Sequence, residues 1–395
     1  MTSNKVKNVL FIGNYDKSYN RNAIFIKGMK RNKIFVYEFN IRTYNIVKNI
    51  LIILRNLRKI KDIDFDLILL HSPTIMQLFF AKYLSLTKRT PLIHDIFISK
   101  LQTFYYDRKV FDNKKILKFF YWIFYYVLDL FECVIPDIIL LDTYNHIKFF
   151  HEKFNVPIKK FRRVLVGAQD DIFYHSDLEK THDDNFIVGF WGTFIPVHGI
   201  EFIIKAAKIL EKEDQINFVL IGEGQTYNKC KELVEKLEVS KISFDPRNFF
   251  KNNQLHLLVR LISEFDIGLG IFGESDKVFQ VIPTKIYEGI AMKIPMITCE
   301  SPAIKELFNN YENILLCKSS DPESLADAIL ELKNNIKLRE RIKQNGYVLF
   351  KENCSIDIIG KRLITVFNRV LEKNKDNKKK FILINKKKQN YERVN

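Results

Sequence analysis

The run from Phe279 to Met292 combines a proline, a lysine and a glutamate at helical spacing. Pro283 suits the first turn of a helix, where its missing N–H costs nothing, and the free N–H groups of that turn can bind an anion. Lys285 adds a positive charge beside them. The Glu288 carboxylate, about 1.4 turns beyond Pro283, can accept hydrogen bonds from two sugar hydroxyls. One helix could therefore bind both a phosphate and a ribose, although an ordinary capped helix with a surface lysine and glutamate would have the same sequence.

Four glycines lie just after short apolar runs that are typical of buried strands: Gly13, Gly192, and the pair Gly222 and Gly224. In open α/β sheets, ligands bind beyond the carboxyl ends of the strands. A glycine there lets the backbone turn tightly and lets a ligand approach closely. One such glycine is weak support, because a chain reversal alone can require it. Several of them after successive strands favour a binding site.

Apolar runs alternate with amphipathic helical stretches along the whole chain of 395 residues. The pattern begins at Val9–Ile12 and starts again at Phe186–Phe190, after a stretch near 167–184 that has no hydrophobic periodicity. Strands that alternate with helices predict parallel sheets with helices on both faces. A chain of this length accommodates two domains. We therefore expect an α/β protein with two Rossmann-like domains, residues 1–175 and residues 185–350.

The composition, with 47% hydrophobic and 28% charged residues and a net charge of +17, allows each half to form a core. The positive surplus favours anionic partners such as a phospholipid surface, nucleic acid or a phosphorylated substrate. Nucleic acid is not expected, because the basic residues form no stripe with interleaved aromatic residues. The segment 373–395 carries two triple-lysine runs around Phe381–Ile384. It is either a solvated tail or a contact with an anionic membrane surface.

The five cysteines are odd in number and widely spaced, and no two form a CxxC pair. This pattern argues against a disulfide framework and a zinc site and favours a reducing cytosol, and the N-terminus has no signal-peptide core. Charges at Lys118, Asp129 and Glu132 interrupt the aromatic segment 116–141. We expect a buried helix there rather than a membrane span, with an interfacial helix as the alternative. The expected location is the cytoplasm, with peripheral attachment to the inner face of the plasma membrane as a candidate.

Two patterns resemble metal sites without meeting their requirements. Asp62-Ile63-Asp64 precedes a strand and so lies at the wrong end of a sheet for a ligand. His146 and His151 are five residues apart, off the i, i+4 face that a pair of helical metal ligands needs. We therefore expect no metal site.

Three blocks of the C-terminal half together resemble the donor domain of the large group 1 family of retaining glycosyltransferases, which have the GT-B fold. The blocks are Gly192–Glu201, Val219–Gly224, and Pro283–Glu288 with its continuation to Thr298. Their order and spacing agree as well as each motif does, and the resemblance covers nearly all of residues 185–350. The N-terminal half resembles the family less sharply, at its opening strand and glycine.

The resemblance implies transfer of a sugar from a nucleotide diphosphate to a hydroxyl group, with retention at the anomeric carbon. It implies a UDP- or GDP-sugar donor, a glycan or lipid-linked acceptor in polysaccharide or glycolipid assembly, and no cofactor. A last helix near 355–372 should cross back to the N-terminal domain. The implied donor-binding residues are Gly192, Thr193, His198, Gly199, Gly222, Gly224, Gln280, Thr284, Lys285 and Glu288.

Three of these positions depart from the family pattern. Gln280 stands eight residues before Glu288, where the family has a second glutamate, and it lacks the charge. Thr193 and His198 stand where the family usually places an arginine and a lysine on the diphosphate. Lys285 and helix N-termini would then have to supply more of the positive charge.

The resemblance also suggests residues of the N-terminal domain. His94 follows a strand where the family often offers a histidine to the donor sugar, with Asp95 as the fallback, and His94 could equally be a packing residue. Gly13, Arg21 and Asn22 lie where the family's first loop faces the acceptor. Arg21 could bind an acceptor phosphate or be an ordinary surface residue.

Two other functions stay open at the level of sequence. One is another sugar-nucleotide enzyme of the same fold, such as an epimerase that acts without an acceptor. The other is a catalytically inactive scaffold, for which the substitutions at Thr193, His198 and Gln280 would be the reason.

Overall fold

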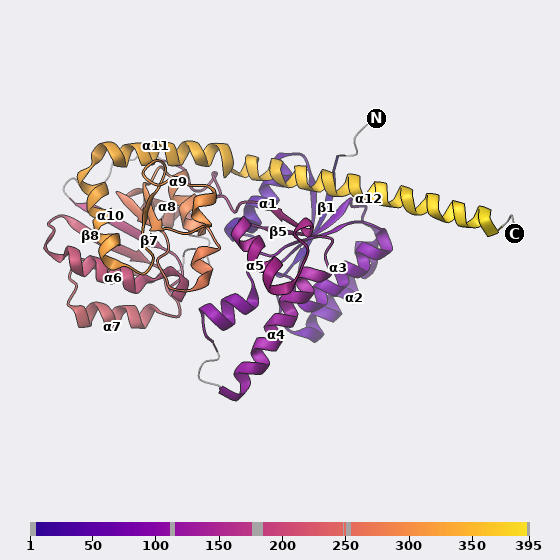
Figure 1. Cartoon of the computed structure of the whole chain (residues 1–395), viewed down its shortest axis with the longest axis horizontal. Coiled ribbons are helices and arrows are strands. Elements are labelled where there is room, and N and C mark those ends of the chain that lie inside the picture. The colour runs from indigo at the N-terminus through magenta and orange to yellow at the C-terminus, as the bar shows by residue number, and fades with distance from the viewer. Residues whose placement is uncertain (1–4, 111–114, 176–184, 248, 250–253, 393–395) are drawn as a thin grey trace.

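The computed structural model describes residues 5–110, 115–175, 185–247, 249 and 254–392. In this part of the chain, two six-stranded sheets form the centres of two domains that lie side by side (Figure 1). Every strand pair in both sheets is parallel. The predicted α/β architecture with two Rossmann-like domains is confirmed.

The N-terminal sheet has the strand order β2-β1-β3-β4-β5-β6. Its strands are β1 Asn8–Gly13, β2 Phe35–Asn40, β3 Leu67–His71, β4 Leu92–Asp95, β5 Ile138–Leu141 and β6 Phe161–Arg163. The helices between them are α1 Asn20–Arg31, α2 Ile46–Asp62, α3 Ile75–Lys88, the π-helix η1 Leu101–Asp107, α4 Lys115–Val134 and α5 Tyr144–Phe154. Strands β3, β4 and β5 are buried along their whole length, as expected of a parallel sheet that is covered on both faces.

The C-terminal sheet has the order β12-β11-β10-β7-β8-β9. Its strands are β7 Phe186–Trp191, β8 Ile216–Ile221, β9 Ile242–Asp245, β10 Ile267–Leu269, β11 Met296–Cys299 and β12 Leu315–Cys317. Its principal helices are α6 Ile200–Ile209, α7 Tyr227–Leu237, α8 Leu255–Ser263, the short η5 Asp276–Phe279, α9 Thr284–Ala291, α10 Pro322–Asn334 and α11 Ile336–Asn353. All five cysteines are buried and free of disulfides.

The last helix, α12 Ile356–Glu392, leaves the C-terminal domain and runs along the N-terminal one, as Figure 1 shows in yellow. It packs on α1 so closely that a Cβ atom on Gly28 would lie 2.9 Å from the Cα atom of Gly360. The helix extends well beyond the end expected near residue 372. The side chains of 375–392 lie outside the described residues, so the two expectations for the basic tail stay predictions.

Helix α4 differs from the buried helix expected at this position. Phe119, Phe120 and Phe124 are 64%, 63% and 54% exposed, and the helix projects beyond the body of its domain (Figure 1). Apolar residues occur all around it, but the sheet covers only one of its sides, so the pattern overstated its burial. No helix within the described ranges is long and apolar enough to cross a membrane.

The two domains are joined by polar contacts as well as by α12. Glu306 of the C-terminal domain accepts hydrogen bonds from the backbone N–H groups of Tyr144 and Asn145, both at 2.8 Å. The Arg163 guanidinium lies 3.3 Å from the same carboxylate. These contacts begin at the N-terminus of α5, where free N–H groups favour a carboxylate. They hold the carboxyl ends of the two sheets toward each other.

Candidate active site between the two sheets

A cavity of about 600 Å³ lies between the carboxyl ends of the two sheets. The N-terminal domain contributes residues after β1, β3 and β5, and the C-terminal domain contributes residues after β7 and β10 together with the start of α9. Seven of the predicted site residues line the cavity: Asn22, Gly192, Thr193, His198, Thr284, Lys285 and Glu288. The position agrees with the rule that ligands bind beyond the carboxyl ends of parallel strands.

Helix α9 carries the strongest part of the site. Pro283 is its N-cap, and Lys285 and Glu288 are only 5% and 1% exposed. Their burial excludes the alternative of an ordinary helix with a surface lysine and glutamate. Glu288 Oε2 accepts a hydrogen bond of 2.8 Å from Trp191 Nε1 at the end of β7. Glu288 Oε1 and Lys285 Nζ are buried without a hydrogen-bond partner among the described residues.

Burial strongly perturbs both of these charged groups. Desolvation raises the pKa of Glu288 to about 7, against the opposing effects of the Trp191 hydrogen bond and the Lys285 charge. Desolvation also lowers the pKa of Lys285 to about 7, and the Glu288 carboxylate compensates only in part. The ammonium group lies 4.2 Å from the centroid of the Phe190 ring, where a cation–π contact supplies some stabilisation. Such shifted groups in a cavity are typical of functional sites.

The glycines at the strand ends serve two different purposes. Gly192 has φ 140° and lines the cavity beside the Lys285 side chain, so it keeps the floor of the site open. Gly222 has φ 132°, and a Cβ atom there would lie 2.0 Å from the carbonyl oxygen of Gly192, so it is needed for backbone packing. It also lines a small adjoining pocket of about 30 Å³. Gly199 and Gly224 pack against neighbouring backbone and do not line the main cavity.

The first loop of the C-terminal domain supplies no positive charge to the cavity. The Nδ1 atom of His198 contacts the backbone oxygen of Thr193. Burial lowers the pKa of His198 well below its usual value, and the positive charge of Lys285 lowers it further. The imidazole is therefore neutral near pH 7, so the cationic role considered for His198 is not supported, although its ring lines the cavity.

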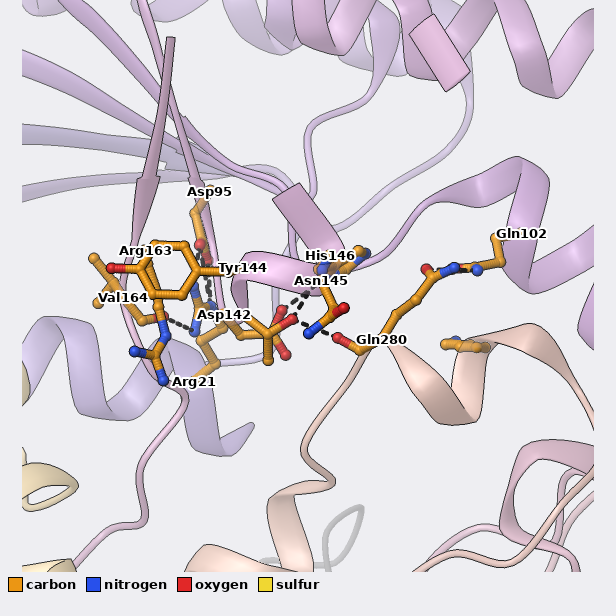
Figure 2. Close-up of polar contacts among 12 residues, drawn as sticks. Arg21, Asp95, Gln102, Asp142, Tyr144, Asn145, His146, Arg163, Val164 and Gln280 are labelled. Carbon is orange, nitrogen blue, oxygen red and sulfur yellow. Dashed lines mark hydrogen bonds and ion pairs between the residues drawn. The ribbon is translucent and has the colours of Figure 1, made fainter. Parts of the chain in front are cut away.

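Gln280 lies at the contact between the domains rather than in the cavity. Its Oε1 accepts a hydrogen bond of 2.7 Å from Gln102 Nε2, and its backbone oxygen accepts one of 2.5 Å from Thr143 Oγ1 (Figure 2). Both partners belong to the N-terminal domain. The side chain that was expected to bind the donor is thus already engaged across the domain boundary.

Arg21 and Asp95 form a fully buried ion pair in the N-terminal domain (Figure 2). Arg21 Nε lies 2.8 Å from Asp95 Oδ2, and Arg21 Nη1 donates a hydrogen bond of 3.2 Å to the Val164 carbonyl oxygen. His71, at the end of β3, places its Nδ1 atom 2.7 Å from the same carboxylate. Arg21 is 0% exposed, so the expectations of an acceptor-binding or a surface arginine are both wrong.

The other N-terminal candidates are placed as follows. His94 is buried with its Nδ1 atom 3.2 Å from the backbone oxygen of Glu132, and burial lowers its pKa to about 3. It does not line the cavity, which favours the packing alternative. Asn22 lines the cavity and donates a hydrogen bond of 2.8 Å to the Asp16 carbonyl oxygen. Gly13 is in contact with the backbone of His71, with no room for a side chain.

Among the cavity-lining side chains that sequence reasoning missed, three are basic: His71, Arg108 and Lys277. His71 directly follows the apolar run of β3, so a search of every strand end would have found it. Arg108 and Lys277 had no such signal, because η1 and η5 are short irregular helices without a clear periodicity. Within the described ranges, no group of three or more His, Cys, Asp or Glu side chains is arranged to hold a metal ion.

Comparisons with known proteins agree with this geometry. Residues 173–349 match the family described as glycosyl transferases group 1. The chain is 31% identical over 195 residues to an uncharacterized glycosyltransferase of Methanocaldococcus jannaschii, covering 47% of this chain and 48% of that protein. It is 26% identical over 207 residues to the capsular polysaccharide biosynthesis glycosyltransferase CapM of Staphylococcus aureus, covering 50% of each. The chain matches these curated relatives over about half of their length.

The whole fold is similar to solved structures at low sequence identity. HepE of Anabaena, solved in complex with UDP-glucose, superposes with a TM-score of 0.65 at 12% identity, over 92% of this chain and 99% of that one. A similarity at this identity supports the fold alone. Residues 173–349 are thus similar to the group 1 glycosyltransferases, and the chain, with two parallel sheets whose carboxyl ends meet at one cavity, has the GT-B fold.

Proposed function

We propose that this protein transfers a sugar from a nucleotide-diphosphate sugar, UDP- or GDP-linked, to a hydroxyl group of a glycan or lipid-linked acceptor in polysaccharide assembly. The observation that carries the proposal is the buried pair on α9. Lys285 Nζ and Glu288 Oε1 stand at one cavity without hydrogen-bond partners among the described residues. Buried polar atoms are normally satisfied, so a ligand with a phosphate and a ribose would complete them.

The proposed chemistry needs stabilisation of the negative charge that develops on the departing diphosphate. Positive side chains fixed in a water-poor cavity do this effectively, because they need no reorganisation during the reaction. Lys285 and the N-terminus of α9 would supply that charge, while Glu288 accepts hydrogen bonds from the ribose hydroxyls. We propose that the anomeric configuration is retained and that no metal ion is required. His71, oriented by Asp95, is the histidine that the N-terminal domain contributes to the cavity, and we propose that it contacts the sugar.

An inactive scaffold is disfavoured by the cost of the site. A buried lysine and glutamate with unsatisfied atoms are expensive to maintain in a protein that binds nothing. An epimerase would share the donor site but would convert the sugar nucleotide into its epimer without any acceptor, with no acceptor-dependent release of free nucleotide. Assays of nucleotide release with and without a glycan acceptor distinguish the two activities, and NMR of the product tests retention.

A thermal-shift panel with UDP, GDP, ADP and CMP, with and without magnesium, tests the donor site. A nucleotide at 100 times its dissociation constant should add about 2.7 kcal/mol to the free energy of unfolding. We expect UDP or GDP to stabilise the wild type without magnesium and to lose most of its effect in Glu288→Ala. Glu300→Ala, which removes an exposed carboxylate, should retain the shift. No shift of the wild type with any nucleotide would overturn the proposal.

We also propose that an anionic membrane surface is a partner, and the exposed helices α2, α3 and α4 support this proposal. They are neighbours: Lys61 of α2 lies over the Tyr83 ring of α3, and Phe79 of α3 contacts Phe131 of α4. Six exposed apolar residues of α4, beside which Phe119 and Ile123 are also exposed, recur every three or four positions: Leu117, Phe120, Phe124, Val127, Phe131 and Val134. Apart from Asp62 at its end, the exposed residues of α2 are apolar or basic: Ile46, Val47, Lys48, Ile50, Leu51, Leu54, Arg55, Arg58, Lys59 and Lys61. Basic and apolar side chains on one exposed surface suit the headgroup region of an anionic bilayer.

Flotation with vesicles of phosphatidylcholine, with and without phosphatidylglycerol, tests this partner. We expect the wild type to float only with the anionic vesicles, and Phe120→Glu/Phe124→Glu to stay at the bottom. A control variant, Val348→Glu, alters an exposed apolar residue of the other domain and should float like the wild type. Sedimentation as a dimer that Phe120→Glu/Phe124→Glu abolishes, without flotation, would instead assign this surface to self-association.

A further inference from the structure

The segment that follows β4 reaches across the cavity to the C-terminal domain. It forms the π-helix η1 and ends at Arg108. Lys277 Nζ, on η5 of the other domain, donates a hydrogen bond of 2.9 Å to Thr103 Oγ1, and Gln225 Nε2 donates one of 2.7 Å to the Arg108 carbonyl oxygen. π-Helices are rare and occur frequently at functional sites. This segment therefore positions an N-terminal arginine against the donor domain.

Three cations from two domains line the same cavity: Arg108, Lys277 and Lys285. Arg108 Nε is buried without a hydrogen-bond partner among the described residues, as is Lys285 Nζ. Burial lowers the pKa of His198 well below its usual value, and the charges of Lys285, Lys277 and Arg108 lower it further. Desolvation also lowers the pKa of Lys277 to about 8.

Three carboxyl groups act on the three cations. Asp107 faces Lys277 and Arg108, and burial raises its pKa above the usual value. Asp142, which lines the cavity and contacts His146 Nδ1 at 2.7 Å, also acts on Lys277. Glu288 is the carboxyl group that faces Lys285. Positions 193 and 198, at the loop after β7, are occupied by a threonine and a neutral histidine. An anion with more than one charge is the ligand that this arrangement suits.

We infer that the diphosphate of the donor is held from both sides of the cleft, by Arg108 of the N-terminal domain together with Lys277 and Lys285 of the C-terminal domain. This inference rests on the proposed function and goes further, because it assigns the phosphate contacts to residues outside the loop after β7. If the inference holds, the bound donor contacts both domains at once. A nucleoside diphosphate would tighten the contact between η1 and the donor domain, whereas the nucleoside alone would not.

Calorimetric titration of UDP, GDP and the matching nucleosides into the full-length chain tests the inference. The variants are Arg108→Gln and Lys277→Gln, and the control is Lys109→Gln, an exposed lysine at the next position. Loss of a charge-assisted contact should weaken binding of the nucleoside diphosphate about 10-fold or more and leave nucleoside binding within about twofold. The control should match the wild type.

The outcomes separate this inference from the proposed function. If the wild type binds a nucleoside diphosphate and both Arg108→Gln and Lys277→Gln bind it with the same affinity, the diphosphate is not held from both sides of the cleft. The proposed donor site would still be supported by that result. No binding by the wild type would overturn both. Hydrogen exchange supplies a second readout: UDP should protect residues 101–108 in the wild type and not in Arg108→Gln, while uridine should protect them in neither. Equal protection by UDP in both proteins would contradict a direct phosphate contact by Arg108.

Discussion

Each domain contains a buried pair of a cation and a carboxylate. The two pairs differ in whether their polar atoms all have hydrogen-bond partners. Arg21 and Asp95 satisfy each other through several hydrogen bonds, with His71 and a backbone carbonyl completing the set. Lys285 and Glu288 leave an ammonium group and a carboxylate oxygen unsatisfied at the cavity. A fully satisfied buried pair fixes a structure, whereas a partly satisfied one has capacity for a ligand.

The pKa values show the same difference. The positive charge of Arg21 and the hydrogen bond from His71 outweigh burial and hold the pKa of Asp95 well below its usual range. The pKa values of Lys285 and Glu288 are instead moved toward each other by burial, each to about 7. The first pair stays ionised over the whole physiological range, and the second can change its charge when a ligand binds.

Removal of the cation from each pair gives the largest expected contrast. Arg21→Met leaves the Asp95 carboxylate buried and uncompensated, which should lower the free energy of unfolding by about 3–5 kcal/mol. Lys285→Met removes a poorly solvated ammonium group, so stability should change little, while nucleotide affinity falls. Urea denaturation of both variants measures the difference. Comparable losses of stability in the two variants would remove the distinction between the pairs.

The second expected difference between the two pairs is the pH dependence of the free energy of unfolding. Because the pKa of Glu288 is raised from 4.5 to about 7, the folded state binds more protons than the unfolded state between these values. The contribution of Glu288 to the free energy of unfolding therefore falls as pH rises through this window, by about 3 kcal/mol in total. Glu288→Gln cannot titrate. The stability of the wild type relative to this variant should fall from pH 4.5 to pH 7, and parallel curves would contradict the raised pKa.

The difference between the domains also explains what the sequence could reveal. The α9 block lies within one helix, so Pro283, Lys285 and Glu288 could be recognised from local spacing. Arg21 and Asp95 are separated by 74 positions, and nothing local distinguishes a buried, paired arginine from one that binds a ligand. The parallel sheets followed from the alternation of strands and helices. Strand β6, Phe161–Arg163, was missed because its two arginines interrupt the apolar pattern.

Helix α4 shows a second limit of local reasoning. Periodicity indicates which side of a helix is apolar, but it does not show how many neighbours are available to cover it. The aromatic residues on all sides of α4 predicted burial, but only the side that includes Asp129 and Cys133 is fully buried. Arg108 was missed for a related reason, because its partners come from the other domain. Both errors concern contacts between elements that are distant in the sequence.

Two histidines near the carboxyl ends of the neighbouring strands β3 and β4 give a smaller and more selective test. His71 faces the cavity and is oriented by Asp95, whereas His94 is enclosed against the backbone of Glu132. His71→Asn should lower kcat about 10-fold through loss of one hydrogen bond to the sugar, worth roughly 1.4 kcal/mol, with little change in melting temperature. His94→Asn should lower the melting temperature and leave kcat of the folded fraction near that of the wild type. The reverse pattern would return the catalytic role to His94, because a residue that serves only packing should change stability rather than turnover.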